Sequence, residues 1–152
     1  MAKIVALCGK LCAGKTTLAQ KLRNELPAVI LNSDELTLAL PFDHDATYPA
    51  VKEFLWRKAV EIARAGANVV LDFGFWSRAD RDEITAMAQA AGVSLQWQYV
   101  SVTDEEWRRN IASRNEKVLS GEDKSYFADE GLIRKCLELF EEPLPGELND
   151  IP

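Results

Sequence analysis

Four short apolar runs stand apart from the polar sequence around them. They are Lys3–Cys8 (KIVALC), Ala28–Leu31 (AVIL), Asn68–Asp72 (NVVLD) and Leu95–Val100 (LQWQYV). The first three are continuously apolar, which is typical of strands covered on both faces of a parallel sheet. The pattern therefore predicts four parallel strands, and it offers no good candidate for a fifth near the C-terminus.

Helical segments alternate with these strands. Apolar residues at three- and four-residue spacing predict a helix over Pro49–Ala65, which Gly66 closes as a C-terminal cap. The other expected helices are Lys15–Leu26, Arg78–Ala91, Asp104–Asn115 and about Asp129–Glu141. The proline-containing tail beyond them cannot be regular helix. This alternation predicts an α/β fold of three layers, with helices on both faces of a parallel sheet of four to five strands.

Length and charge narrow the class of protein. We expect one domain over residues 1–152, because a chain of this length can bury a substantial core. The formal net charge of −6 argues against a protein that holds nucleic acid by general electrostatics, although a local basic groove stays open. The apolar run at the N-terminus is too short for a signal peptide, and no stretch reaches transmembrane length. We therefore expect a soluble cytoplasmic protein without a membrane partner.

The three cysteines are Cys8, Cys12 and Cys136. An odd number without scaffold-like spacing predicts reduced thiols in a cytosolic protein. A metal pair made of Cys8 and Cys12 is the less favoured alternative, because the chain has a single histidine. We expect all three cysteines to pack as small apolar side chains.

A glycine-rich loop joins the first strand to the first helix and matches the Walker A pattern G-x-x-x-x-G-K-[ST]. Its glycines permit a close backbone approach, so that loop N–H groups form an anion nest at the start of a helix. Lys15 is expected at the β- and γ-phosphates, and Thr16 offers a hydroxyl to Mg²⁺. The predicted nucleotide-binding residues of this P-loop are Gly9, Lys10, Leu11, Cys12, Ala13, Gly14, Lys15, Thr16 and Thr17.

Nucleotide binding alone does not define a function, because switches, motors and kinases share this loop. The short chain and the lack of N-K-x-D and D-x-x-G motifs favour a small kinase over a motor or a GTPase switch. Two alternatives stay open. One is a module that senses or hydrolyses ATP without a dedicated acceptor, and the other is a polynucleotide 5′-hydroxyl kinase, which the acidic balance disfavours.

Four segments together carry a resemblance that spans most of residues 3–141. They are Gly9–Thr17 (GKLCAGKTT), Leu31–Leu36 (LNSDEL), Val69–Glu83 (VVLDFGFWSRADRDE) and Trp107–Asn115 (WRRNIASRN). In these segments the chain resembles the small P-loop kinases of the zeta-toxin and chloramphenicol-phosphotransferase type, including the compact AAA family of that group. The resemblance implies transfer of a γ-phosphoryl group to a hydroxyl of a small molecule, with ATP and Mg²⁺ as cofactors and ATP preferred to GTP.

Two carboxylates follow strands. In kinases of the resembling type, a carboxylate at the place of Asp34 accepts the proton of the acceptor hydroxyl or positions that hydroxyl in line. The alternative is that Asp34 only caps a helix. Asp72 ends the third strand, at the edge where open α/β sheets bind ligands. We expect Asp72 to hold a substrate hydroxyl or, with Thr16, a Mg²⁺-bound water; Asp34 is the other candidate for the metal.

The resemblance also implies an acceptor pocket and a lid. Phe73–Trp76 either line that pocket or pack in the core. Arg78 or Arg81 is expected near the phosphates; Arg78 is preferred, because an arginine on a helix, such as Arg81, is more often a solvated charge. A lid is predicted at about 108–127, with its mobile part at 116–127, and an arginine from such a lid neutralises the transferring group.

Of the three lid arginines Arg108, Arg109 and Arg114, Arg114 is preferred. It shares a helix side with Trp107 and Ile111, whereas Arg109 lies on the opposite side. We therefore expect Arg114 to be both catalytic and nucleotide-binding, together with Lys15 and Asp34 as catalytic groups. Asn110 stands where many relatives carry a second lid arginine, so the sequence does not identify that arginine.

The segment between the second strand and the next helix contains the only histidine, His44. A lone surface histidine most often has no function, but this segment collects the acceptor in the resembling kinases. The carboxylates Asp34, Glu35, Asp43 and Asp45 form an acidic mouth that would suit a cationic or polyhydroxyl acceptor. The alternative is that these loop acids are only solvated.

Overall fold

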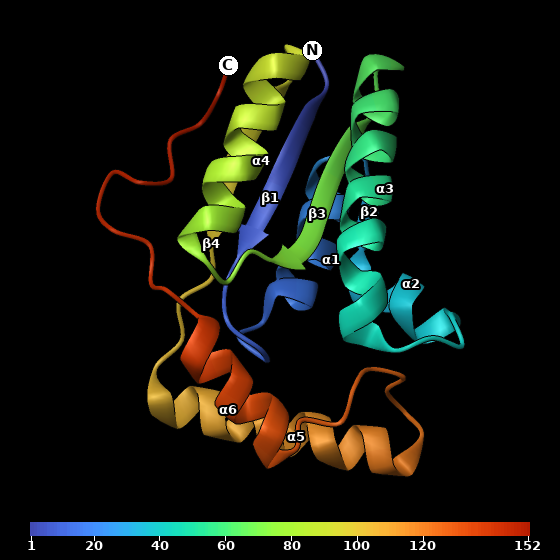
Figure 1. Cartoon of the computed structure of the whole chain (residues 1–152), viewed down its shortest axis with the longest axis vertical. Coiled ribbons are helices and arrows are strands. Elements are labelled where there is room, and N and C mark those ends of the chain that lie inside the picture. The colour runs from blue at the N-terminus through green and yellow to red at the C-terminus, as the bar shows by residue number, and fades with distance from the viewer.

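A computed structural model describes residues 1–152 (Figure 1). Its four strands are all parallel and lie in the order β2-β3-β1-β4, which confirms the predicted α/β class. The elements in chain order are β1 (Lys3–Cys8), α1 (Lys15–Glu25), β2 (Ala28–Asn32), α2 (Ser33–Ala39), α3 (His44–Arg64), β3 (Asn68–Gly74), α4 (Arg78–Ala91), β4 (Ser94–Tyr99), α5 (Asp104–Ser120) and α6 (Glu130–Leu139).

The two central strands are buried on both faces. One face of β1 and β3 packs against α3 and α4, where Leu71 belongs to the same core as Leu55 of α3 and Ile84 of α4. On the other face, Leu7 and Val70 pack with the α1 side. Helices thus cover both faces of the sheet (Figure 1). The continuously apolar sequences of β1 and β3 follow from this double burial.

The edge strand β2 differs from the expectation of full burial. It has a neighbour on one side only, and Val29 keeps 43% of its surface exposed. A short apolar run predicts a strand but does not tell whether the strand is central or at the edge, because four residues do not show a period.

Helices α5 and α6 lie across the carboxyl ends of the strands (Figure 1). They pack on the P-loop and not on a face of the sheet, in a small core made of Leu11, Cys12, Trp107, Ala128 and Cys136. All three cysteines are free and buried, as the sequence predicts. The second apolar core therefore joins the α5–α6 arm (Asp104–Leu139) directly to the predicted nucleotide loop.

Local caps explain three differences from the predicted helices. The side chain of Asp43 accepts from Ala46 N at 3.0 Å, so α3 begins at His44 and contains Pro49. The short helix α2 was not predicted; the side chain of Asn32 caps it by accepting from Glu35 N at 3.0 Å. Helix α5 continues to Ser120 and ends at Gly121 in the left-handed region.

The tail after α6 follows the outer edge of β4 without becoming a fifth strand. Ile151 forms a single antiparallel bridge with Leu95, in which the two backbone N–H···O distances are 2.9 and 2.8 Å. Asp150 accepts from Trp97 N at 2.8 Å. The tail thereby occupies hydrogen-bonding groups that an edge strand otherwise leaves unpaired.

A buried ion pair connects this tail to the turn after β3. Arg81 Nε lies 2.7 Å from Glu147 Oε1, and the two side chains are 2% and 4% exposed. Arg81 also donates to the carbonyls of Phe75 and Trp76 at 3.0 and 3.1 Å. The expectation of a solvated Arg81 is therefore wrong, because the guanidinium satisfies two turn carbonyls and one carboxylate inside the protein.

We expect Glu147→Gln to lower the free energy of unfolding by about 3 kcal/mol, because it leaves the buried charge of Arg81 without its counter-ion. The hydrogen bond from Arg81 is the main cause that lowers the pKa of Glu147 below its ordinary value. A depressed pKa means that this stabilisation is present above the ordinary pKa and is lost as the pH falls through the folded-state pKa. Urea unfolding should therefore show a difference from wild type at pH near 7 that shrinks in acid.

Glu61→Gln is the matched control, because Glu61 pairs with Lys58 on the surface, where an ion pair contributes little. Equal losses of stability in the two variants would contradict a structural role for the buried pair.

Candidate functional site

The P-loop bends tightly between β1 and α1. Gly9 N donates to Gly74 O at 3.0 Å, and a Cβ on Gly9 would lie only 2.9 Å from Val100 O. Gly14 adopts a φ of 101°, in the left-handed region that favours glycine. The two glycines of the motif thus meet the steric demands that the sequence predicts for them.

The α5–α6 arm holds the outer side of this loop. Trp107 Nε1 donates to Leu11 O, and Leu11 N donates to Cys136 Sγ at 3.4 Å. The ammonium of Lys10 lies 4.4 Å from the Trp107 ring centroid. Lys10 therefore points toward α5, and its side chain does not line the cavity beside the loop.

Asn110 contacts the loop at its strained residue. Cys12 has a φ of 56°, which is uncommon for a residue with a side chain, and its carbonyl accepts from Asn110 Nδ2 at 2.9 Å. Sequence reasoning saw Asn110 only as a missing arginine. In the structure, it is a second anchor of the P-loop on α5.

Asn110→Ala is expected to raise the Kd for MgATP about 3- to 10-fold, which matches the net worth of one hydrogen bond. The reason is that the loop loses the partner that holds Cys12 in its left-handed conformation. Isothermal titration with MgATP would measure this change, and Arg109→Ala is the matched control because Arg109 pairs only with exposed Glu105, at 3.5 Å. An unchanged Kd in Asn110→Ala would show that Asn110 does not contribute to MgATP binding.

The Thr16 hydroxyl and the Asp72 carboxylate form a hydrogen bond beside the P-loop. Thr16 Oγ1 donates to Asp72 Oδ2 at 2.7 Å, and Asn32 Nδ2 donates to the same oxygen at 2.8 Å. Asp72 is 5% exposed and lies two residues before the end of β3, near the carboxyl edge of the sheet. This oxygen donor set fits Mg²⁺, which takes one or two protein oxygens and completes its shell with water and phosphate. Asn32, which the sequence analysis did not single out, orients Asp72.

Lys15 lies inside the loop that it follows. Its Nζ donates to Gly9 O at 2.9 Å and to Lys10 O at 2.7 Å. Burial lowers the pKa of Lys15, and the nearby charge of Asp72 opposes this shift. The ammonium is thus a cation held inside the loop, where the low dielectric strengthens its interaction with any opposite charge.

Asp34 and Arg114 line the same cavity. Asp34 opens α2 and keeps 47% of its side chain exposed, and Arg114 lines the cavity from α5. Desolvation by the surrounding protein raises the pKa of Asp34, while the charges of His44 and Arg114 oppose that rise. A carboxylate with a raised pKa is a better proton acceptor near neutral pH.

One large cavity contains most of these groups. Its volume is about 1420 Å³, beyond the few hundred to a thousand Å³ of an ordinary ligand pocket, so it can hold a nucleotide and a second molecule. Of the predicted nucleotide-binding residues, 11–17 line it, whereas Gly9 and Lys10 do not. It also contains Asp34, Asp72 and Arg114.

Arg78 lies elsewhere. Its side chain is half exposed, pairs with Asp82 at 3.7 Å and does not line the cavity, because α4 turns it toward solvent. The structure therefore does not bring Arg78 to the cavity, in contrast to the expectation that it lies near the phosphates. Arg108 and Arg109 are likewise exposed.

The aromatic run after β3 serves both of the purposes that the sequence left open. Phe73 and Phe75 belong to the main core, and Phe75 meets Trp97 edge-on at 5.2 Å between ring centroids. Trp76 is only partly buried, and it lines the cavity together with its neighbours. Trp76 is thus the aromatic residue of this run that is most available to a ligand.

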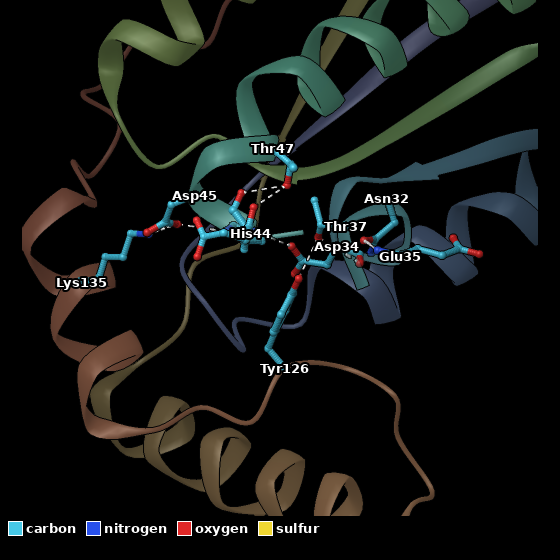
Figure 2. A network of polar contacts seen from close by, with 10 residues as sticks. Asn32, Asp34, Glu35, Thr37, His44, Asp45, Thr47, Tyr126 and Lys135 are labelled. Carbon is cyan, nitrogen blue, oxygen red and sulfur yellow. Dashed lines mark hydrogen bonds and ion pairs between the residues drawn. The ribbon is translucent and has the colours of Figure 1, made fainter. Parts of the chain in front are cut away.

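Other protein groups pair with several carboxylates of the acidic mouth. Asp45 pairs with Lys135 of α6 at 2.6 Å and with His44 at 3.1 Å (Figure 2). Asp43 uses its carboxylate as a helix cap. Asp34 lies 3.7 Å from His44. Neighbouring protein groups therefore engage three of the four carboxylates, and this weakens the argument for a cationic acceptor.

The sequence profile of the AAA_33 family, described as an AAA domain, matches residues 4–143. A sequence search among curated proteins finds no significant match. None of the helices is both long and apolar enough to cross a membrane.

Solved structures share the fold at low sequence identity. An unliganded sugar kinase from Janibacter sp. HTCC2649 aligns with a TM-score of 0.67 and 18% identity, over 97% of this chain and 83% of the other. Kti12 from Chaetomium thermophilum, in complex with ADP-AlF3, aligns with a TM-score of 0.71 and 17% identity, over 93% and 82% of the two chains. A chain of the Pnkp1/Rnl/Hen1 RNA repair complex aligns with a TM-score of 0.70 and 18% identity, over 99% of this chain but only 48% of its own length.

Proposed function

This chain belongs to the AAA_33 family of AAA domains, and on that premise we propose that it is a phosphotransferase that moves the γ-phosphoryl group of ATP to a hydroxyl of a small molecule. The observation that carries the proposal is the meeting of a P-loop, the Thr16–Asp72 pair and the Asp34 carboxylate in one cavity. A module that only binds ATP needs the first two features and has no use for the third.

Each group has a task on the donor side. Loop N–H groups and Lys15 bind the β- and γ-phosphates, while Thr16 and Asp72 would hold Mg²⁺, with Asp72 acting directly or through water. When bound, Mg²⁺ would neutralise charge on the phosphate oxygens. Arg114 faces the same space and stabilises negative charge on the group in transfer.

On the acceptor side, Asp34 orients the hydroxyl and takes its proton as the new O–P bond forms. ADP leaves with the electron pair of the broken bond. The cavity beside Asp34 includes Tyr48, Trp76 and Tyr126, and it therefore offers aromatic faces next to a carboxylate. This lining suits a polyhydroxyl compound, which agrees with the fold shared with a sugar kinase.

A screen with γ-labelled ATP and Mg²⁺ tests the proposal. Sugars, polyols, amino sugars and an RNA with a 5′-hydroxyl would be offered in parallel, and we expect label on a small polyhydroxyl compound. Label on the RNA alone would favour a polynucleotide kinase, the reaction suggested by the fold shared with an RNA repair complex. Release of labelled phosphate without any labelled acceptor would favour the ATP-hydrolysing module.

A further inference from the structure

A chain of polar contacts runs from the α5–α6 arm to the Asp34 carboxylate (Figure 2). Lys135 Nζ of α6 donates to Asp45 Oδ1 at 2.6 Å, and the same oxygen lies 3.1 Å from His44 Nδ1. On the other side of the ring, His44 Nε2 lies 3.7 Å from Asp34 Oδ1. His44 is thus the residue through which a lysine on α6 reaches the candidate base.

The backbone of α2 has a second connection to the same arm. Tyr126 OH and Thr37 Oγ1 are 2.9 Å apart, and Thr37 Oγ1 donates to Asp34 O at 3.2 Å. Because the threonine hydroxyl has one hydrogen, Tyr126 is the donor in the first contact when Thr37 donates in the second. The arm therefore contacts both the main chain and the side chain of the Asp34 region.

Aromatic neighbours fix the orientation of the His44 ring. Tyr48 of α3 stacks on it, with ring centroids 5.5 Å apart and an interplanar angle of 21°. Tyr126 meets it edge-on at 5.3 Å and 83°. The ring is thus held between α3 and the segment that follows α5, so its two nitrogens stay directed at Asp45 and Asp34.

We propose that His44 is a positioning residue for Asp34, which couples the placement of that carboxylate to the closure of the α5–α6 arm over the cavity. The inference rests on the proposed function of Asp34 as the base. Its physical reason is that Asp34 is half exposed and has no other side-chain partner within hydrogen-bonding or ion-pair distance, so it can adopt other rotamers when His44 is absent. With Oδ1 directed at His44, Oδ2 stays free for the acceptor hydroxyl.

Two contacts of the α5–α6 arm link the covering of the cavity to the placement of Asp34. The arm makes these contacts in the present structure, where Lys135 reaches Asp45 and Tyr126 reaches Thr37 and His44. Both contacts strengthen the placement of Asp34 when the cavity is covered and water is excluded. An open arm would leave Asp34 less ordered and would disfavour transfer to water.

Kinetics of His44→Ala, His44→Gln and Lys135→Met, with the acceptor identified in the screen, test this coupling. We expect His44→Ala to lower kcat about 10- to 100-fold, as a misplaced catalytic group does, with the Kd for a non-hydrolysable ATP analogue unchanged. His44→Gln should recover most of the rate, because its amide nitrogen can lie near the place of Nε2. Lys135→Met should lower kcat less, and the double variant His44→Ala/Lys135→Met should be no slower than His44→Ala.

Lys58→Met is the matched control, because Lys58 pairs with Glu61 on the exposed side of α3, away from the cavity. An unchanged kcat in His44→Ala, a His44→Gln variant as slow as His44→Ala, or fully multiplicative effects of His44→Ala and Lys135→Met would each overturn the inference.

If the wild-type protein transfers phosphate to no acceptor, the proposed function fails, and hydrogen exchange then decides the coupling separately. With the ATP analogue and Mg²⁺ bound, Lys135→Met and His44→Ala should both reduce the protection of the α2 amides, whereas Lys58→Met should not. Unchanged α2 protection in the first two variants would overturn the coupling itself.

Discussion

Asp34→Asn is expected to lower the rate of phosphoryl transfer by about 100- to 10,000-fold, the range for loss of a general base. Asparagine has nearly the same shape, but it cannot accept the proton of the acceptor hydroxyl. Because Asp34 lies on α2 and not in the P-loop, the Kd for MgATP should change little. Single-turnover transfer from labelled ATP would measure the chemical step, and calorimetry would measure binding.

Asp82→Asn is the control for this variant, since Asp82 is an exposed carboxylate on α4 that pairs with Arg78 at 3.7 Å. Transfer at the wild-type rate in Asp34→Asn would show that the carboxylate is not the base. Loss of MgATP binding together with transfer would instead assign Asp34 to the donor side.

Lys15→Ala is expected to weaken MgATP binding about 10- to 150-fold, the value of a hydrogen bond to a charged group. The turnover should fall by a further factor of about 100 or more, because Lys15 also stabilises charge that develops on the γ-phosphate. Titration calorimetry and kcat at saturating MgATP separate the two effects. Lys21→Ala is the control, since Lys21 lies on the exposed side of α1 beside Glu25.

The stability of Lys15→Ala gives an independent check. Burial lowers the pKa of Lys15, which means that the folded protein holds this charge at a cost. The variant should therefore melt at the same temperature as wild type or higher, as expected when a functional site is relieved of a buried charge. A strongly lowered melting temperature would mean that the loss of binding reflects unfolding and not the loss of a phosphate contact.

The parts of the site that could be predicted are those set by local sequence. The P-loop is recognisable because its glycines, lysine and threonine stand close together in the sequence. Asp72 is recognisable because it directly follows the apolar residues Val69–Leu71. The apolar run Ala28–Leu31 was too short to show that β2 is an edge strand. A helical wheel could place Arg114 on the inner side of α5, but it could not show which residues of other elements line the same cavity as Arg114.

The residues that were missed act through distant partners. Asn110 binds the carbonyl of Cys12, which is 98 positions away in the sequence. Lys135 binds Asp45 across 90 positions, and Arg81 binds Glu147 across 66. In the sequence each of them is an ordinary polar residue of a helix, and only the packing of the elements gives it a partner.

The bridge between Ile151 and β4 has a consequence for redesign of the chain. Ile4 pairs with Leu95 and Leu95 with Ile151, so Ile4 and Ile151 lie about two strand spacings apart, or roughly 10 Å. Figure 1 shows both termini at the same end of the molecule. A short peptide could join them, and the chain could be reopened after Gly121, on an exposed turn between α5 and Tyr126. In such a circular permutant, α5 and α6 would each keep its own attachment to Leu11, through Trp107 and Cys136, while the covalent link between them is cut.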